Sequence, residues 1–366
     1  MPLPIILGVA ALGATVFGAQ KGYDGYQKHS RADDIVDDAK RRYQHQRDEF
    51  DEQETSTHEA LSDLGEHELA LGKTFDEFST LAEALLQQLN QHRKKPLQIR
   101  LPRHELQKIE TFSITAVGVL GTAAGASAAG AAAGFAVYGG VMTRGAASTG
   151  TAIASLSGAA ATNATLAALG GGSLATGGLG MAGGTMVLGA SVAAPVLAIA
   201  GWAYDKHGEE ALRNARQAAD EADSAIEKLA LALDKLADTE RYAGHILTTL
   251  QDMFSLFSPY FETLREIDQQ LKRKRQQGQQ AAEAFLDALG DDILTSIENG
   301  YALASLMVNL MTTPIFKLNT APSSAPETVE SSTPLALDDE GNTLLDRDSL
   351  DMAIQTATTG LAEYQA

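Results

Sequence analysis

Cysteine is absent from the 366 residues, proline occurs only ten times, and aromatic residues make up 6% of the chain. Without cysteine there is no disulfide and no thiolate metal site, and the redox compartment stays open. Basic residues are also scarce, because the formal net charge is −19. That balance excludes nucleic acid as a partner, since phosphate binding needs a basic face. Contact with anionic lipid would have to come from apolar segments instead.

Charged side chains are almost missing from residues 111–204, where Arg144 is the only one. This glycine-rich block is too apolar for an exposed linker and too poor in large side chains for an ordinary core. Small residues spaced four apart let two helices approach backbone to backbone, which is how helices associate in lipid. The block contains three such pairs: Gly121 and Gly125, Gly130 and Gly134, and Gly180 and Gly184. We therefore predict a helical hairpin that enters or spans a membrane.

The second apolar helix of the glycine-rich block carries two further signs of insertion. Leu188 lies in its apolar middle, and Trp202 and Tyr204 close it, as interfacial aromatic anchors do. A soluble alternative stays open, because helices of glycine and alanine also pack tightly inside bundles. Residues 145–180, between the two apolar helices, are compatible with helix or with a β-tongue.

Basic residues gather just before the glycine-rich block, at the five positions Arg93, Lys94, Lys95, Arg100 and Arg103. Their position predicts contact with lipid head groups. The plainer interpretation is solvated charge that complements the dipole at a helix C-terminus. The sequence favours neither over the other.

The N-terminus begins with an uncharged apolar run from Pro2 to Ala19. It resembles a signal peptide only in part, because no Lys or Arg precedes the run and Phe17 is too large for the cleavage pattern. At about 18 residues it reaches the lower limit for crossing a bilayer. We expect residues 1–20 to form an uncleaved anchor or a buried apolar helix.

Two long segments, 21–95 and 205–275, carry apolar residues alternately three and four apart, the pattern of a coiled coil. In the first segment the pattern runs through Leu61, Leu64, Glu68, Leu71, Phe75, Phe78, Ala82, Leu85 and Leu89. In the second it runs through Leu212, Ala215, Ala219, Ala222, Ile226, Leu229, Leu233 and Leu236, and on to Leu271. We predict that they pair antiparallel as a stalk, with Leu229 and Leu233 near residues 64–78 and the hairpin at the tip.

The remaining segments complete a seven-part organisation. Prolines at 96 and 102 predict a linker over 96–110. A further helix over 279–316 is expected to pack at the base of the stalk. Residues 317–366 are rich in proline, serine, threonine and acidic residues, and we predict a flexible acidic tail with one short helix near 350–361. The predicted fold class is all-α: an elongated antiparallel helical stalk with a hydrophobic hairpin.

Enzyme motifs are weak or missing. Residues 178–183 fit GxGxxG, but no strand precedes them and the first acidic residue, Asp205, follows a long apolar helix. No Walker A, GxSxG or HExxH pattern occurs. We therefore predict that the chain is not an enzyme, and we assign no catalytic, cofactor-binding or metal-binding residue.

Residues 157–166, 170–175 and 183–185 form a glycine-, alanine- and threonine-rich pattern, and the chain starts with the apolar sequence Met-Pro-Leu-Pro-Ile-Ile-Leu-Gly. Together these are similar to a module of widespread, largely uncharacterised bacterial proteins, over about 1–30 and 115–250. In architecture the chain resembles the α-pore-forming toxins of the cytolysin A type. No residue motif supports the second resemblance, so it implies no functional residues. The hairpin is also longer than in those toxins, and the acidic tail is extra.

Three functions follow as hypotheses. The first is a non-enzymatic protein of bacterial competition or defence that inserts into membranes, oligomerises and forms a pore, with a soluble form before insertion. The second is a permanent membrane-anchored scaffold that recruits a partner protein through the stalk or the acidic tail. The third is a soluble structural coiled-coil protein. In the first two the lipid bilayer is a partner, and the location is membrane-associated.

Overall fold

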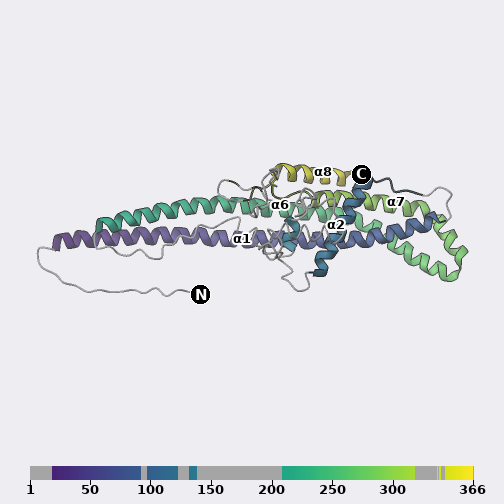
Figure 1. Ribbon diagram of the computed structural model, residues 1–366, viewed down its shortest axis with the longest axis horizontal. Coiled ribbons are helices and arrows are strands. Elements are labelled where there is room, and N and C mark those ends of the chain that lie inside the picture. The colour runs from purple at the N-terminus through teal and green to yellow at the C-terminus, as the bar shows by residue number, and fades with distance from the viewer. Residues whose placement is uncertain are drawn as a thin grey trace, which may run out of the picture. The chain divides into compact units, whose positions relative to one another are not determined.

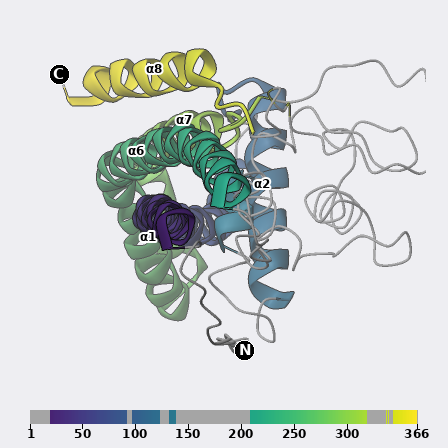
Figure 2. The same cartoon turned by 90° about the vertical axis from the view of Figure 1, so that its left-hand side faces the viewer.

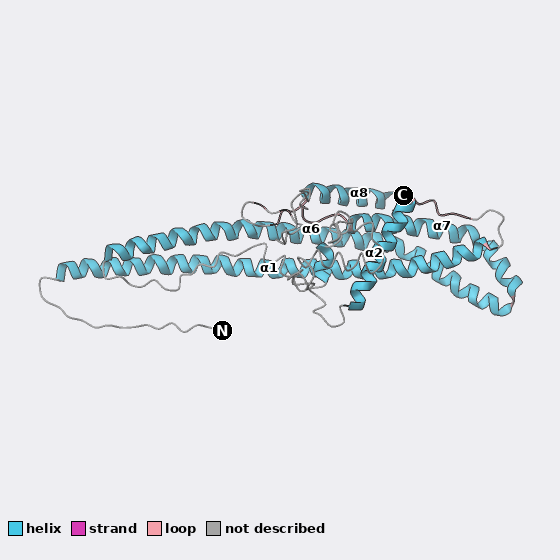
Figure 3. Ribbon diagram, viewed as in Figure 1, coloured by secondary structure: helices cyan, strands magenta, loops and turns pink. Residues whose placement is uncertain are grey.

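The computed structural model describes residues 19–91, 97–122, 132–137, 208–317 and 343–365, together with Ala336 and Asp338. Five long helices account for most of them: α1 (Ala19–Asn90), α2 (Arg103–Thr122), α6 (Gly208–Gln277), α7 (Gln279–Met311) and α8 (Arg347–Gln365) (Figures 1 and 3). Residues 132–137 are helical as well, and no strand is formed by the described residues. The predicted all-α class is confirmed.

The chain divides into two compact units, and α1 and α6 each contribute to both. The first unit comprises Met1–Glu52 and Ala194–Leu233, and the second comprises Gln53–Ala193 and Asp234–Ala366. In the first unit the buried side chains of the two helices are mostly alanines: Ala32 and Ala39 on α1, and Ala215, Ala218, Ala222 and Ala225 on α6. Small side chains allow the two helices to lie close together, with Phe50 and Leu229 as large buried residues of this unit.

In the second unit α1 and α6 run parallel. Gln53 donates a hydrogen bond to Glu240, and further along both helices Phe75 meets Phe257, with ring centroids 5.5 Å apart. Residue numbers rise together on the two helices, and Figure 1 shows the colour progressing in the same direction along both. The predicted antiparallel pairing is therefore wrong.

The same contacts show why Leu229 and Leu233 do not reach residues 64–78. That part of α1 packs against α6 from Phe254 onward, for example through Phe78 and Phe257. A heptad pattern is identical when read in either direction, so it predicts that a helix pairs but not with which polarity. The polarity follows from the connection, and here the chain between α1 and α6 is long enough to return before α6 starts.

Burial on α1 follows the predicted pattern at every position from Leu61 to Leu89. On α6 one of the two seam positions of each heptad is confirmed, through Ala215, Ala222, Leu229, Leu236, Ala243, Leu250, Phe257, Leu264 and Leu271. The other position is buried as predicted at Phe261 but is shifted by one residue elsewhere, where the buried side chains are Ala218, Ala225, Ala232, Thr239, Ile246, Met253 and Ile267. The larger neighbours, such as Ile226 and Leu233, lie partly exposed at the edge. Their size made them the better seam candidates in the sequence, but a side chain of α6 is buried only where it points toward α1.

An aromatic cluster forms the centre of the second unit. The Phe78 ring, fully buried, lies edge-on to Phe257, Phe261 and Tyr301 at centroid distances of 5.1, 5.8 and 5.0 Å. Such geometry is favourable for aromatic pairs. Gly300 lets α7 approach, because a Cβ atom there would overlap the Phe78 ring. The cluster joins α1, α6 and α7.

One helix boundary differs from the expected one, the start of α2, whereas the break expected between residues 275 and 279 is present. α2 begins at Arg103, within the predicted linker 96–110, because the Pro102 carbonyl accepts hydrogen bonds from the amides of Glu105 and Leu106. Gly278, at φ 131°, separates α6 from α7, a backbone conformation that glycine adopts most readily. The expected apolar helix over residues 1–20 lies outside the described residues, apart from the start of α1.

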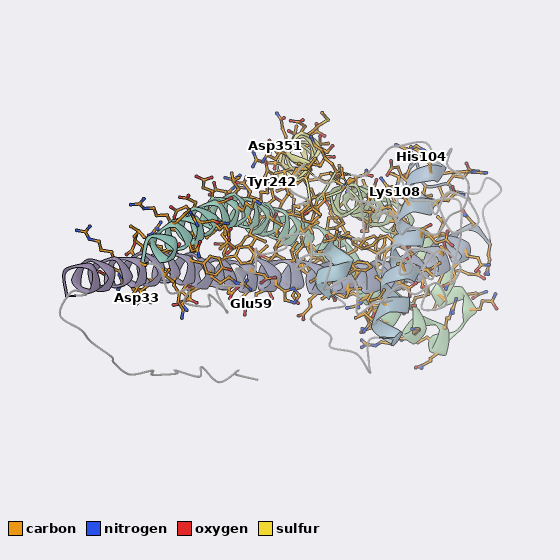
Figure 4. All side chains as sticks on the ribbon, turned by 60° about the vertical axis from the view of Figure 1, so that its left-hand side comes forward. Asp33, Glu59, His104, Lys108, Tyr242 and Asp351 are labelled. Carbon is orange, nitrogen blue, oxygen red and sulfur yellow. The ribbon has the colours of Figure 1, made fainter. Side chains whose placement is uncertain are left out.

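The short helix predicted near 350–361 is present as α8, whereas the expectation of a flexible tail over 317–366 is wrong for residues 343–365, which are folded. α8 packs on α7, where Gly360 meets Leu306. The Tyr242 hydroxyl of α6 donates a hydrogen bond of 2.8 Å to Asp351 of α8, and Figure 4 shows the two side chains together. Ion pairs between Arg347 and Asp238 and between Lys235 and Asp338 add to the attachment. Acidic composition alone does not show that such partners exist.

Candidate functional site

The candidate site is the contact between α1 and the described part of the glycine-rich block. Two glycines of α1 make it. A Cβ atom at Gly65 would overlap the carbonyl oxygen of Ala132, and one at Gly72 would overlap the Ala116 side chain of α2. Figure 2, with α1 seen end-on, shows α2 running across it rather than along it. Glycine permits this crossing because it carries no side chain to hold the backbones apart.

The buried side chains of α2 and of residues 132–137, which include Phe112, Ala116 and Ala132 beside the two glycines of α1, are apolar or small. The buried residues are Ile109, Phe112, Ser113, Thr115, Ala116 and Val119 of α2, and Ala132, Ala133, Phe135, Ala136 and Val137 of the next helical segment. The Phe112 and Phe135 rings pack edge to face at 5.5 Å. The hydroxyls of Ser113 and Thr115 donate hydrogen bonds to backbone carbonyls within α2, so they need no hydrogen-bond partner on α1.

The opposite face of α2 is apolar as well, although it is exposed. Ile114, Val117 and Leu120 are 37%, 41% and 41% exposed and lie three residues apart on one side of the helix. An exposed helix face in a soluble protein is usually polar. This part of the glycine-rich block is therefore apolar on both of its sides.

A polar network holds the start of α2 to α7. The Glu105 carboxylate accepts hydrogen bonds from Ser305 at 2.6 Å and from Asn309 at 3.3 Å, and Lys108 donates to Asn309. Burial opposes ionisation of Glu105, but these hydrogen bonds and the Lys108 charge outweigh it and lower its pKa. Burial lowers the pKa of Lys108, with Glu105 opposing. Figure 4 shows Lys108 on α2. The first turns of α2 are thus anchored by polar contacts, and its later turns by apolar ones.

Among the residues that the structure describes, Glu68 is the one acidic or basic side chain that is buried, with 2% exposure. It follows Gly65 by three residues and precedes Gly72 by four, so its side chain leaves α1 on the face that meets the block. Its Oε2 atom has no hydrogen-bond partner. Burial raises the pKa of Glu68 well above that of an exposed glutamate. In the sequence it was only a polar position in an apolar pattern.

The predicted insertion residues fall into two groups. Gly121 and Gly134 are described, and a Cβ atom built on either would meet nothing within 4 Å, so neither makes a close helix contact in this structure. Their role in close packing within lipid stays a prediction. The others lie outside the described residues: Gly125, Gly130, Gly180, Gly184, Leu188, Trp202 and Tyr204. Close approach occurs instead at Gly65 and Gly72 of α1, whose seven-residue spacing is the signal that sequence reasoning missed.

The predicted head-group residues are likewise divided. Arg93, Lys94 and Lys95 lie outside the described residues. The Arg100 side chain is 87% exposed, with its Nε atom 3.6 Å from a Glu298 carboxylate oxygen. Arg103 is exposed in the first turn of α2. Both described arginines therefore present their charge to solvent near the start of the glycine-rich block.

Two further features of the described residues concern metal binding and membrane spanning. No group of three or more His, Asp or Glu side chains there is arranged to hold a metal ion. None of the helices in the described ranges combines the length and apolar character needed to cross a bilayer. Comparison with protein families, curated proteins and solved structures finds no match for this chain.

Proposed function

We propose that this chain is a non-enzymatic protein that inserts its glycine-rich block into a lipid bilayer, oligomerises there and forms a pore in bacterial competition or defence. The observation that carries the proposal is α2, which begins the block. It packs on α1 through glycine and alanine, and exposes Ile114, Val117 and Leu120 on its other side. In this proposal, a soluble form of the protein precedes insertion. The resemblance of the chain to cytolysin A-type toxins is one of architecture.

Small contacts support reversible docking. Burial of apolar surface stabilises a contact by about 25 cal/mol per Å², and glycine and alanine bury little surface each. The contacts at Gly65 and Gly72 are close but small in side-chain area, so these two crossing points add little to the free energy of docking, and the larger buried side chains, such as Phe112 and Phe135, supply most of it. In lipid the same small residues allow close helix packing. The exposed Arg100 and Arg103 would then lie where anionic head groups attract basic side chains.

A reversible crosslink tests whether release of α2 is required. The chain has no native cysteine, so cysteines introduced at Lys108 and Asn309, whose side chains are hydrogen-bonded, form the one reactive pair. A short bis-maleimide with a reducible centre should join α2 to α7 and suppress dye release from liposomes. Reduction should restore release. Each single-cysteine variant, treated alike, is the control.

Charges within the block test the inserting element directly. Gly125→Asp or Leu188→Lys should cost about 2.5–3.5 kcal/mol per site on insertion, because each charge enters an apolar helix centre. Gly180→Leu keeps the hydrophobicity but hinders close packing. Liposome flotation and dye release are measured for each variant, with circular dichroism as the folding control. If the charged variants float and leak like wild type, the block does not insert.

The same assays separate the other hypotheses. Flotation of wild-type protein without dye release would favour a membrane-anchored scaffold that recruits a partner protein. Protein that neither floats nor releases dye would be a soluble structural coiled-coil protein. Dye release that rises steeply with protein concentration is the result expected of an oligomeric pore.

A further inference from the structure

Glu68 lies inside the contact that keeps the glycine-rich block on α1. Gly65 meets Ala132 and Gly72 meets Ala116, and Glu68 lies between the two glycines on the same face. It is 2% exposed, and its Oε2 atom is buried without a hydrogen-bond partner. A carboxyl group in such a place is tolerated when neutral and strongly disfavoured when ionised.

The helical segments packed against this face bring no charge toward Glu68. Residues 111–122 and 132–137 contain no ionisable side chain other than hydroxyls. Earlier in α2, Glu105 and Lys108 are engaged with Ser305 and Asn309 of α7. Glu110 is exposed.

The other described elements near this level of α1 also offer no group that would stabilise an ionised carboxyl. On α6 the facing side chains are Leu250, Met253 and Phe257, and Asp252 and His245 are exposed. On α1 itself His67 faces Phe254, and its pKa is lowered by burial alone. Burial is likewise the sole cause of the shift at Glu68. Among the residues that the structure describes, no nearby cation stabilises the carboxylate.

We propose that Glu68 controls docking of the glycine-rich block through its protonation: the block stays on α1 while the carboxyl is neutral and leaves when the carboxyl ionises. Ionisation would place an unpaired charge between apolar surfaces, and departure of the block lets water reach it. The inference rests on the proposed function only for what the released block does next. The release itself is a property of the described contact.

The sign follows from proton linkage. The docked state holds the carboxyl with a raised pKa, and the released state with the ordinary pKa of an exposed glutamate. Docked protein therefore binds more protons, and docking weakens as pH rises from the ordinary value toward the docked one. Between those two values the docking equilibrium should change about tenfold per pH unit. Acidic pH retains the block, and higher pH releases it.

Thiol labelling can follow docking without any membrane. Val119 is buried one turn after Ala116, the α2 residue that meets Gly72, and Leu120 is exposed. Val119→Cys therefore reports release, and Leu120→Cys is its matched control. The ratio of their labelling rates cancels the pH dependence of thiolate formation, to which both thiols are subject. With Glu68 present, this ratio should rise with pH by up to tenfold per unit.

Three variants decide the outcome. Glu68→Gln and Glu68→Met should keep the ratio low and independent of pH, because neither can ionise. His67→Gln should keep the wild-type pH dependence. A flat ratio in the wild type, or an unchanged pH dependence in both Glu68 variants, would overturn the proposal. Circular dichroism verifies that each variant folds, and two replacements at Glu68 guard against failure of one.

Liposome flotation across the same pH range separates this inference from the proposed function. A pH-dependent labelling ratio without flotation at any pH would leave the Glu68 control intact and remove the membrane function. Flotation that is equal at all pH values, together with a flat labelling ratio, would support the membrane function and remove the Glu68 control.

Discussion

Parallel pairing of α1 and α6 in the second unit can be tested with crosslinks, because the chain contains no cysteine. Two pairs of side chains are in direct contact: Gln53 with Glu240, and Glu77 with Arg265 at 2.7 Å. Cysteines at either pair should be joined by a short bis-maleimide within one chain. The product keeps the mass of a monomer and migrates faster on a denaturing gel.

The mismatched pair supplies the control. Gln53 and Glu77 are 24 residues apart on α1, which is about 36 Å along a helix. Cysteines at Gln53 and Arg265 should therefore be separated by roughly that distance and should not react with the same reagent. In an antiparallel arrangement residue numbers fall on one helix as they rise on the other, so both matched pairs could not form together.

The result that would refute the parallel arrangement is efficient crosslinking of Gln53 with Arg265 and none of Gln53 with Glu240. Products of twice the monomer mass from the matched pairs would show that the contacts form between chains. Both outcomes are read from one gel, with each single-cysteine variant as a blank. Circular dichroism before crosslinking verifies that the four positions tolerate cysteine.

Three further predictions concern stability, measured by urea unfolding with circular dichroism. Phe78→Ala should cost about 3–5 kcal/mol because it empties the aromatic cluster, while exposed Leu231→Ala should change stability by less than about 0.5 kcal/mol; equal effects would contradict the assigned core. Gly300→Val should cost about 1–3 kcal/mol through overlap with the Phe78 ring, and a neutral result would mean that α7 lies further away. Tyr242→Phe should lose roughly 0.5–1.5 kcal/mol and speed hydrogen exchange in α8, where Asp351 loses its donor; unchanged exchange would count against that attachment.

Prediction from sequence succeeded where a residue's surroundings are set by its own helix. The apolar pattern from Leu61 to Leu89 needed only the period of an α-helix, and every position in it is buried. The break between residues 275 and 279 was predicted, and Gly278 fixes it. The start of α2 directly after Pro102 was not predicted. The second seam position of α6 was missed by one residue, because a choice between Leu233 and Ala232 depends on where the partner helix lies.

The candidate site was less accessible to sequence reasoning. Four-residue glycine spacing drew attention to Gly121 and Gly134, which meet nothing. Gly65 and Gly72 stand in a charged helix, and their role exists only because α2 and residues 132–137 cross α1 at those points. Glu68 looked like an ordinary polar position in a seam. Its role becomes apparent only because the structure packs residues 111–122 and 132–137, which carry no charge, on the same face of α1.

Composition and periodicity by themselves determined that this chain is helical, that its two long segments bear pairing faces, and that one block lacks charge. These are local properties, since each depends on residues within a few turns of one another. Only the tertiary structure decided that α1 and α6 run parallel, that α8 is held on α6 and α7, and that Glu68 is enclosed. Each of these depends on which distant segment arrives at a given face, and a repeating pattern is equally satisfied by several partners.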